Sequence, residues 1–336
     1  ASSAASDVYK RQAQSSLDEY LQTAAENNPG LKAKFNEYLA ALEKIPQVGT
    51  LPDPDVAFGA FILPVETRVG AQQFKVGASQ MFPWFGTLKN RKDAVAEMAN
   101  VKLAQFEAAK NQLFYKVKKV WFEWYQLHQT IAFEQEDLKI LQSFEELALI
   151  KYEAGLSSMV DVLRVQMEIK EAQNEILSLQ DKIVPLQSTF NALLNRDLAT
   201  EITIPDTLFL PEIGQSKTEL VATIQSQNPE LQTLQFKQLA DEKNIIVQQQ
   251  NGSPTFGVGL DYVLVGKRND AEIPDNGKDI LMPKISLKVP LQRKKYNAAI
   301  KEAEYKVLAT EYEKQNAENH LLLSLIHISE PTRREG

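Results

Sequence analysis

The sequence predicts an α+β fold in which long antiparallel helical hairpins are joined to amphipathic strand hairpins. Three observations carry this prediction. The chain contains an internal duplication, four short segments alternate apolar with polar residues, and residues 87–153 contain neither proline nor glycine. Helices and strands differ in the period of their apolar residues, so each kind of element can be assigned from its own pattern.

The duplication predicts two copies of one structural unit. A gapless shift of 200 residues pairs identical residues at eight positions, which in the first copy are Asn28, Pro29, Leu31, Leu39, Ala40, Ile45, Pro54 and Gly59. This period is much longer than that of a solenoid repeat, which has about 20 to 50 residues. We therefore predict a first repeat over residues 13–200, a linker over 201–215, and a second repeat over 216–324 that stops inside its long helix.

Four segments have the period of strands with one apolar face. Residues 255–265 alternate strictly, and residues 281–289 repeat the alternation. In the first copy residues 74–82 alternate in the same way, whereas Val56–Leu63 is apolar on both faces and gives a weaker pattern. Strands of about nine to eleven residues cross a bilayer when they are tilted. Alternation alone is equally compatible with two ordinary hairpins on a soluble core.

A single long helix is predicted over residues 87–153, because nothing in that stretch breaks a helix. At 1.5 Å per residue it is about 100 Å long. Apolar residues recur in it every three or four positions, and a second run after a turn keeps the same heptad pattern. The two seams are Leu113, Val117, Val120, Trp124, Leu127 and Ile131, then Ile169, Ala172, Ile176, Leu179, Ile183, Leu186, Phe190 and Leu193. Such seams predict an antiparallel coiled-coil pair, and Pro185 is expected to kink or divide its second helix.

The two helices meet at a short turn over residues 151–163. Gly155 can adopt the left-handed conformation that ends a helix. Ser158 can cap the next helix, and Asp161 completes a capping box three residues later. The chain is therefore expected to form a helical hairpin with a tight tip.

Composition excludes several classes of function. A formal net charge of -7 and the lack of a concentrated basic face argue against nucleic-acid binding. The absence of cysteine removes disulfides, thiolate metal sites and cysteine nucleophiles. His128 lies in a long helix without a nearby carboxylate-histidine set, His320 is near the expected truncation, and His327 belongs to the adapter-like tail. The five methionines are scattered. We therefore expect no catalytic site, no metal site and no cofactor. No run of about eighteen apolar residues is present, so any membrane contact is expected to involve strands or a surface helix.

Both ends of the sequence resemble translated sequencing adapter. These segments are residues 1–12 (ASSAASDVYKRQ) and residues 325–336 (LIHISEPTRREG). We expect them to be non-native and the chain to be a truncated fragment, so its native start and end are not visible.

Local motifs agree with the predicted order of elements. The motifs are Asn28-Pro29 and Asn228-Pro229, Met81–Gly86 and Val289-Pro290-Leu291 after the second strand of each pair, and Tyr152–Gly155 followed by Asp161-Val162-Leu163. With these motifs the chain resembles the TolC-type outer-membrane efflux channel family, and its sequence is most similar to the cation- and drug-efflux branches. The second helical hairpin of that family, with its own tip and any gating residues there, is absent from the sequence.

The resemblance implies an α+β membrane protein that forms a homotrimer in the outer membrane. Each protomer would contribute four strands to a twelve-stranded β-barrel, and its helical hairpins would form a periplasmic tunnel, the α-barrel. Four strands cannot close a barrel, and an open edge in lipid is costly, so strands from other chains are required. Apolar alternates would face lipid, and the residues expected to face the water-filled lumen are Lys75, Ser79, Asp261, Lys284 and Lys288. Trp84 is expected at the membrane interface.

The tip of the hairpin is the expected functional surface. In the family this end of the tunnel meets a periplasmic adaptor, also called a membrane fusion protein, which couples the channel to an inner-membrane efflux pump. The residues expected to dock the adaptor are Tyr152, Gly155, Leu156, Ser157 and Asp161. A turn with a purely structural role would need the same glycine and cap.

The resemblance thus implies a passive exit duct of a tripartite efflux system and not an enzyme. A separate pump would drive metal ions or small toxic molecules through it. The alternative is a soluble periplasmic or cytosolic coiled-coil scaffold or tether. That alternative accounts for the heptads and the tip, but it leaves two copies of paired amphipathic strands unexplained.

Overall fold

The computed structural model describes residues 17–205, 208, 214–270 and 272–329. Residues 1–12 of the adapter-like ends, and residues 330–336, lie outside the described part of the chain. The chain divides into two compact units. The first unit contains the chain up to Phe35 and Phe106–Ser216, and the second contains Asn36–Gln105 and the chain from Lys217 onward. The second unit therefore takes strands from both proposed repeats, and the division into repeats stays a prediction.

The elements follow the order expected from the sequence. After a helix over residues 17–27 come α2 (Pro29–Gly49), β1 (Asp55–Ala60), β2 (Glu66–Thr67), β3 (Gly70–Phe82), α3 (Thr87–Glu153), α4 (Met159–Asp181), α5 (Ile183–Leu193), α6 (Lys217–Gln227), α7 (Pro229–Asn251), β4 (Thr255–Val265), β5 (Ile280–Lys288) and α8 (Arg293–Ser329).

Both Asn-Pro pairs begin a helix. Asn228 caps α7 by accepting hydrogen bonds from the backbone N–H groups of Glu230 (2.9 Å) and Leu231 (3.4 Å). The side chain of Asn28 likewise accepts from Leu31 N–H at 3.1 Å. The proline follows at the first helical position, where its missing N–H removes no hydrogen bond. The interruption expected at each Asn-Pro is therefore an N-cap.

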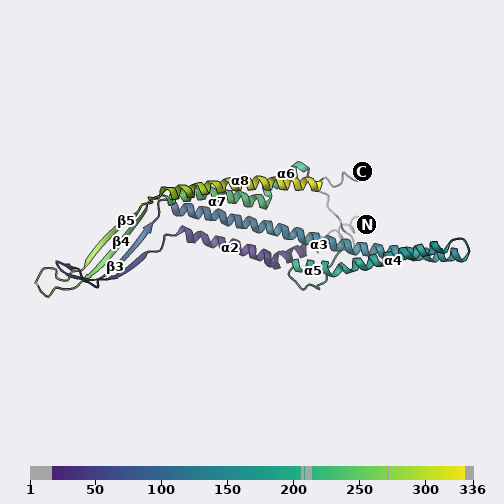
Figure 1. Cartoon of the computed structure of the whole chain (residues 1–336), viewed down its shortest axis with the longest axis horizontal. Coiled ribbons are helices and arrows are strands. Elements are labelled where there is room, and N and C mark those ends of the chain that lie inside the picture. The colour runs from purple at the N-terminus through teal and green to yellow at the C-terminus, as the bar shows by residue number, and fades with distance from the viewer. Residues whose placement is uncertain (1–16, 206–207, 209–213, 271, 330–336) are drawn as a thin grey trace, which may run out of the picture. The chain divides into compact units, whose positions relative to one another are not determined.

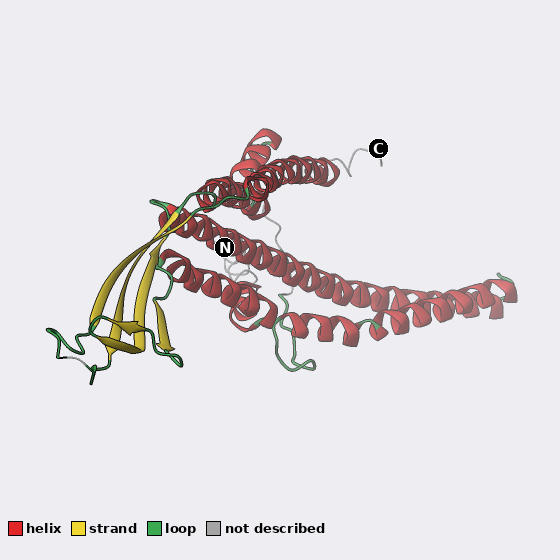
Figure 2. Cartoon of the chain, turned by 60° about the vertical axis from the view of Figure 1, so that its left-hand side comes forward, coloured by secondary structure: helices red, strands yellow, loops and turns green. Residues whose placement is uncertain are grey.

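The second unit contains one antiparallel sheet in the order β1-β3-β4-β5, with the short β2 paired to the start of β3. The strands lie side by side in Figure 1, and Figure 2 shows loops at one end of the sheet and helices at the other. Strand pairs from the two copies meet at β3 and β4, where Gly77 lies opposite Asp261.

Two strand boundaries differ from the prediction. β1 ends at Ala60, so Phe61–Leu63 lies outside it, and β3 begins four residues earlier than Phe74. The register of β3 shifts between Gln72 and Phe74, and beyond that bulge the chain turns into the short β2 ladder. The apolar residues on both faces of Val56–Leu63 therefore did not predict where the pairing of β1 with β3 ends.

One face of the sheet carries large apolar side chains that are exposed. Across the sheet at its helix-proximal end, Phe82 of β3 lies opposite Phe256 of β4, which lies opposite Leu287 of β5. At the middle of the sheet Phe58 of β1 pairs with Val76 of β3, which pairs with Tyr262 of β4. All six are more than a third exposed. The opposite face carries glycines and charged residues, as strand alternation requires.

In the first unit, α4 returns antiparallel along α3, as predicted. Near the tip the Gln166 amide donates to the Glu145 carboxylate at 2.7 Å. Further along, Leu179 of α4 packs with Leu127 and Ile131 of α3. From Gln166 to Leu179 the residue numbers rise, while those of their partners on α3 fall from Glu145 to Leu127. The two helices of the hairpin therefore run in opposite directions.

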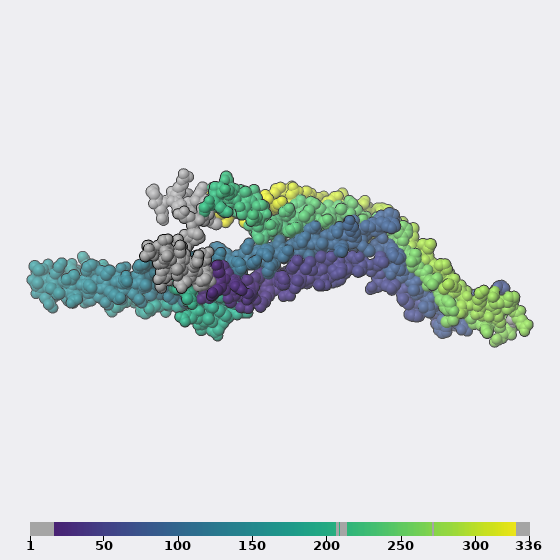
Figure 3. All heavy atoms as spheres, turned by 180° about the vertical axis from the view of Figure 1, so that it is seen from behind, coloured from purple at the N-terminus to yellow at the C-terminus, as the bar shows by residue number. Residues whose placement is uncertain are grey.

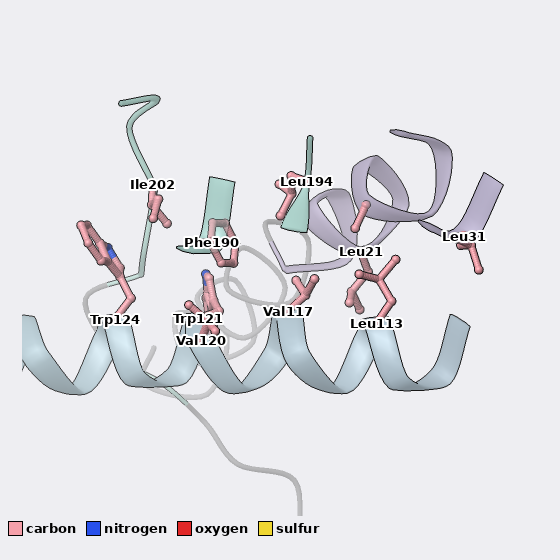
Figure 4. Close-up of a cluster of buried hydrophobic side chains, with 11 residues drawn as sticks. Leu21, Leu31, Leu113, Val117, Val120, Trp121, Trp124, Phe190, Leu194 and Ile202 are labelled. Atoms are coloured by element: carbon pink, nitrogen blue, oxygen red, sulfur yellow. The ribbon is translucent and has the colours of Figure 1, made fainter. Parts of the chain in front are cut away.

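The core of the first unit lies at the base of this hairpin. Figure 4 shows Val117, Trp121 and Trp124 directed from α3 toward Phe190 and Ile202. Trp121 and Trp124 are buried, in agreement with the expectation that they pack. Ile202, at the start of the predicted linker, is also buried in this core.

Pro185 divides the second seam helix, which is one of the two outcomes predicted for it. The break falls at Lys182, between the end of α4 at Asp181 and the start of α5 at Ile183. Proline has no N–H to donate to the carbonyl four residues earlier, and its ring collides with that carbonyl. The disruption therefore falls one turn before the proline itself.

In the second unit α7 and α8 form an antiparallel pair (Figure 1). The Thr310 hydroxyl donates to Asp241 at 3.0 Å, and Lys237 pairs with Glu313 at 2.6 Å. None of the described helices carries an apolar run long enough to cross a bilayer.

Candidate functional site

The hairpin tip is built by a glycine in the left-handed region. Gly155 has φ 72°, and the N–H of Leu156 donates to the Lys151 carbonyl at 2.8 Å, which closes the end of α3. No atom lies within 4 Å of where a Cβ on Gly155 would be. The glycine is therefore required by backbone conformation and not by crowding.

The capping box predicted at Ser158 and Asp161 is present. The Asp161 carboxylate accepts from the Ser158 N–H at 3.1 Å and from the Ser158 hydroxyl at 2.8 Å. These hydrogen bonds hold the pKa of Asp161 below its ordinary value, with the hydroxyl as the larger cause and the nearby Arg164 charge as a smaller one. Asp161 is thus an ionised cap at the start of α4.

The other expected tip residues are placed together on this turn. Leu156 is 78% exposed and Tyr152 is 44% exposed, so apolar surface faces solvent at the end of the hairpin. The Ser157 hydroxyl is buried and has no hydrogen-bond partner. Figure 3 shows the outer part of the hairpin as a narrow rod on which no other segment of its unit packs. The tip therefore presents both apolar surface and an anionic cap.

A second candidate site lies on the polar face of the sheet. Lys75 of β3 and Lys284 of β5 each form an ion pair with Asp261 of β4, at 2.6 Å and 2.5 Å. The Asp261 side chain is 0% exposed, while the two lysine side chains are each about two fifths exposed. The carboxylate is therefore enclosed by two ammonium groups that remain in contact with solvent, and the triad carries a net charge of +1.

Gly77 makes room for this triad. It lies directly opposite Asp261 in the ladder, and a Cβ added there would overlap the Asp261 carboxylate. Gly259 is crowded as well, since its Cβ would lie 3.0 Å from Ser79 and 3.4 Å from Lys284. The glycines on this face thus leave the space that the neighbouring charged side chains occupy.

The structure brings three of the five expected lumen residues into direct contact, and two lie apart. Ser79 pairs with Gly259, next to the triad. Lys288 lies at the end of β5 opposite Thr255, and its side chain lines a cavity at the junction of sheet and helices. The assignment of this face to a lumen stays a prediction.

Several residues near these sites were not found from the sequence. Gly77 and the buried Thr87 are examples, because a glycine in a strand and a threonine at a helix start are common in other contexts.

Trp84 stacks on Phe256 with ring centroids 5.7 Å apart, at the end of the sheet where an interface residue was expected. His128 bonds the Trp124 carbonyl within its own helix at 2.9 Å. Among the described residues, no group of three His, Asp or Glu side chains is placed to hold a metal ion.

A family model described as outer membrane efflux protein matches residues 20–196. Among solved structures, the chain is similar to the outer membrane protein VceC from Vibrio cholerae, with a TM-score of 0.72 and 16% identity over 94% of this chain and 78% of that one. It is also similar to CusC, with a TM-score of 0.71 and 14% identity over 93% and 75% of the two chains.

The open state of the MtrE outer membrane channel from Neisseria gonorrhoeae gives a TM-score of 0.67 and 14% identity over 93% of this chain and 72% of that one. A comparison with curated proteins gives no match. The solved structures establish the fold, and the fold class predicted from the sequence is confirmed.

Proposed function

The chain belongs to the outer membrane efflux protein family, a family of outer-membrane channels and not of enzymes, and we propose that it forms the exit duct of a tripartite efflux system. In this proposal three copies of the chain enclose an aqueous path. A periplasmic adaptor and an inner-membrane pump complete the system.

The observation that carries the proposal is the sheet of the second unit. One face exposes large apolar side chains, and Ile285 of β5 is 87% exposed on it. The opposite face carries the Lys75–Asp261–Lys284 triad. Edge strands β1 and β5 each have one unpaired side among the described strands. A sheet that is apolar outside, polar inside and open at both edges suits a barrel completed by other copies in lipid.

A second apolar stripe on α3 supports assembly from several copies. Phe133, Ile140, Phe144 and Leu147 are all more than half exposed, and their spacings of seven, four and three place them on one side of the helix. The seam with α4 uses other residues, such as Leu127 and Ile131. The stripe is therefore free to pack on helices of a neighbouring protomer and to form the wall of a tunnel.

The conduit acts passively in this proposal. Its residues supply a water-filled path, and the pump supplies the energy and most of the selectivity. The cargo class is metal ions or small toxic molecules, which pass as solutes and are not held by a resident ligand set.

The hairpin tip is the proposed docking surface for the adaptor. Leu156 and Tyr152 supply exposed apolar area, and the Asp161 carboxylate supplies a fixed negative charge. The partner would therefore present an apolar contact flanked by a positive or hydrogen-bond-donating group.

The alternative, a soluble coiled-coil scaffold or tether, needs the hairpin but not the sheet. In a soluble scaffold, the exposed apolar row of Phe82, Phe256 and Leu287 would face water, and the scaffold function gives no reason for it. Patches of this kind on soluble proteins mark interaction sites or aggregation-prone surface.

Ion conduction tests the duct directly. The complete gene product is purified from outer membranes and inserted into planar lipid bilayers, and discrete conductance steps from a trimeric species are expected. A protein that is found only in the soluble fraction, or that gives no conductance as a trimer, contradicts the duct and favours the scaffold.

Adaptor docking is tested by Gly155→Val and Asp161→Lys in the same gene product. Valine at a left-handed position costs roughly 1 to 2 kcal/mol, and lysine places a positive charge at a helix N-terminus, so both changes are local. Trimer yield and outer-membrane insertion are expected to stay near normal, while crosslinking to the adaptor and export fall. Asp181→Lys, at the exposed end of α4 far from the tip, is the control and should change none of these. Export that survives both tip changes, or trimers that disappear with them, would refute docking at this surface.

A further inference from the structure

A cavity of about 460 Å³ lies in the second unit where the sheet meets the helices. Its walls come from the end of β5, the start of α3, the end of α7 and the start of α8, which converge at this place in Figure 1. The volume is in the range of pockets that hold small molecules, roughly 300 to 1,000 Å³. From the sequence, this region was expected to contain an interface residue at Trp84, a lumen-facing Lys288 and a proline-containing exit from the strand, but no binding site.

Three cationic side chains line the cavity. They are Arg91 of α3, Lys288 of β5 and Lys295 of α8, and none of the lining residues, all of which the structure describes, is acidic. The Arg91 guanidinium donates to the Asn251 side-chain oxygen at 2.7 Å, which fixes the arginine while its remaining N–H groups stay available. A pocket with three positive charges and no internal counter-charge favours an anionic ligand.

Two buried polar atoms in the cavity lack partners. Thr87 is only 2% exposed, and its hydroxyl oxygen has no hydrogen-bond partner. The Gln250 side-chain oxygen is buried and unpaired as well. Such groups are rare in native interiors because each loses its hydrogen bonds to water without replacement. Both residues line the cavity, so a ligand bound there is the nearest candidate partner for their unpaired oxygens.

The start of α3 adds to the positive character of the site. Gly86, with φ 81°, turns the chain so that Thr87 becomes the first residue of this 67-residue helix. The helix dipole favours negative charge at such an end, while the N–H of Thr87 itself donates to the Trp84 carbonyl at 3.0 Å. Arg91 follows one turn after the helix start, so the helix dipole and the guanidinium favour the same ligand charge. The buried Thr87 hydroxyl adds a hydrogen-bonding group beside them.

We propose that this cavity binds a phosphate ester. Arg91, Lys288 and Lys295 neutralise the phosphate, and the Thr87 hydroxyl donates to one of its oxygens. The Gln250 oxygen accepts a hydrogen bond from a hydroxyl or ammonium group on the same ligand. An ester with a polar head supplies such a donor better than inorganic phosphate does at neutral pH. The proposal concerns the second unit alone and stands independently of the duct.

The rim of the cavity is apolar. Trp84 and Leu291 line it, Leu291 is largely exposed, and Trp84 stacks on Phe256 of the exposed apolar sheet face. A phospholipid could place its headgroup in the cavity and its chains against this face. A soluble phosphate ester offers the same headgroup chemistry without chains, so the two sources are distinguished by experiment.

The test uses the purified full chain in detergent and three probes: inorganic phosphate, glycerol 3-phosphate and a short-chain phosphatidylglycerol below its micelle concentration. Binding is followed by ³¹P NMR. Saturable binding of the lipid alone identifies a lipid headgroup, and equal binding of the lipid and glycerol 3-phosphate identifies a soluble ester. Either result supports the site, whereas failure of both esters to bind overturns it.

Two variants and one matched control locate the binding. Thr87→Val keeps the shape of the side chain and removes the hydroxyl, so binding should weaken about tenfold, the size expected for one hydrogen bond to a charged group. Lys295→Gln should weaken binding by a similar factor. Lys294→Gln changes the same charge one residue away, outside the cavity lining, and should leave binding within about twofold.

The Thr87→Val variant also separates binding from folding. A buried hydroxyl without a partner is unfavourable, so its removal should leave the melting temperature of the ligand-free protein unchanged or higher. Equal loss of binding in Lys294→Gln and Lys295→Gln would indicate unspecific attraction to cations and overturn the site. Wild-type affinity in both Thr87→Val and Lys295→Gln would do the same.

Discussion

At the scale of single residues, the tip is organised by one glycine and one acid. Gly155 reverses the chain in a conformation that L side chains rarely adopt, and Asp161 fixes the start of α4 by bonding Ser158 twice. Neither residue is buried, so their contribution is to local geometry and to the charge presented to a partner.

The cap at Asp161 predicts a definite response to pH. Since its pKa is lowered from 3.8 in the folded chain, the cap's contribution to stability is complete above the ordinary pKa. It is lost as pH falls through the lowered value. Ser158→Ala removes the hydroxyl donor but keeps the backbone donor, so the Asp161 pKa should rise part of the way back, as measured by NMR titration of the carboxylate. Thr130→Ala on α3 is the control. An unchanged Asp161 pKa in Ser158→Ala would show that the hydroxyl does not hold the carboxylate.

Glycines on the polar face of the sheet differ in how much space they leave. At Gly77 a Cβ would overlap the Asp261 carboxylate, whereas at Gly59 on the same face the nearest atom is the Lys75 Cβ at 4.0 Å. Alanine substitutions at Gly77 and Gly59 can therefore be compared to test whether the triad contributes to stability.

Gly77→Ala should lower the melting temperature of the protein because it displaces Asp261 from Lys75 and Lys284. Gly59→Ala should be neutral or stabilising by about 0.4 to 1 kcal/mol, because alanine reduces the freedom of the unfolded chain at a site with room for its methyl group. Thermal unfolding of the two variants in the same detergent decides the matter. Equal melting temperatures would mean that the triad does not constrain the sheet.

At the scale of elements, the hairpin depends on its inner seam. Leu179 is 8% exposed between Leu127 and Ile131, while its near neighbour Leu177 is 59% exposed on the outer side of α4. The seam was visible in the sequence because heptad spacing fixes which residues meet.

Leu179→Ala should destabilise the first unit by about 2 to 5 kcal/mol, as for other buried leucines that leave a cavity. Leu177→Ala in the monomeric chain should change stability by no more than about 0.5 kcal/mol. Urea unfolding followed by helical circular dichroism measures both. Similar losses in the two variants would place the seam elsewhere on α4.

At the scale of the whole molecule, the described sheet has two unpaired edges, at β1 and β5, and α3 carries one exposed apolar stripe. The sheet joins strands from both copies of the duplication through β3 and β4, so neither copy alone completes it. The proposed trimer covers the stripe of Phe133, Ile140, Phe144 and Leu147.

Ile140→Gln combined with Phe144→Gln should therefore reduce trimer yield while leaving the helical content of the monomer unchanged, because both side chains are already exposed in the single chain. Crosslinking and light scattering in detergent measure assembly. Glu146→Gln, an exposed residue of the same helix, is the control and should assemble normally. Full trimer yield in the double variant would exclude this stripe from the interface.

The elements that rest on local periodicity and turn chemistry were predictable without the structure. The limits of α3 and of β4, the left-handed Gly155, the cap at Asp161 and the seam between α3 and α4 were all predictable, because they depend on residues near in sequence or on a regular repeat. The pairing of β3 with β4, the convergence of Lys75 and Lys284 on Asp261, and the cavity shared by Thr87, Arg91 and Lys295 became visible only in the three-dimensional structure. These depend on register between segments about 200 residues apart, for which local propensity carries no information. The end of β1 depends on its register with β3 and on the bulge near Gln72, which the apolar pattern does not reveal.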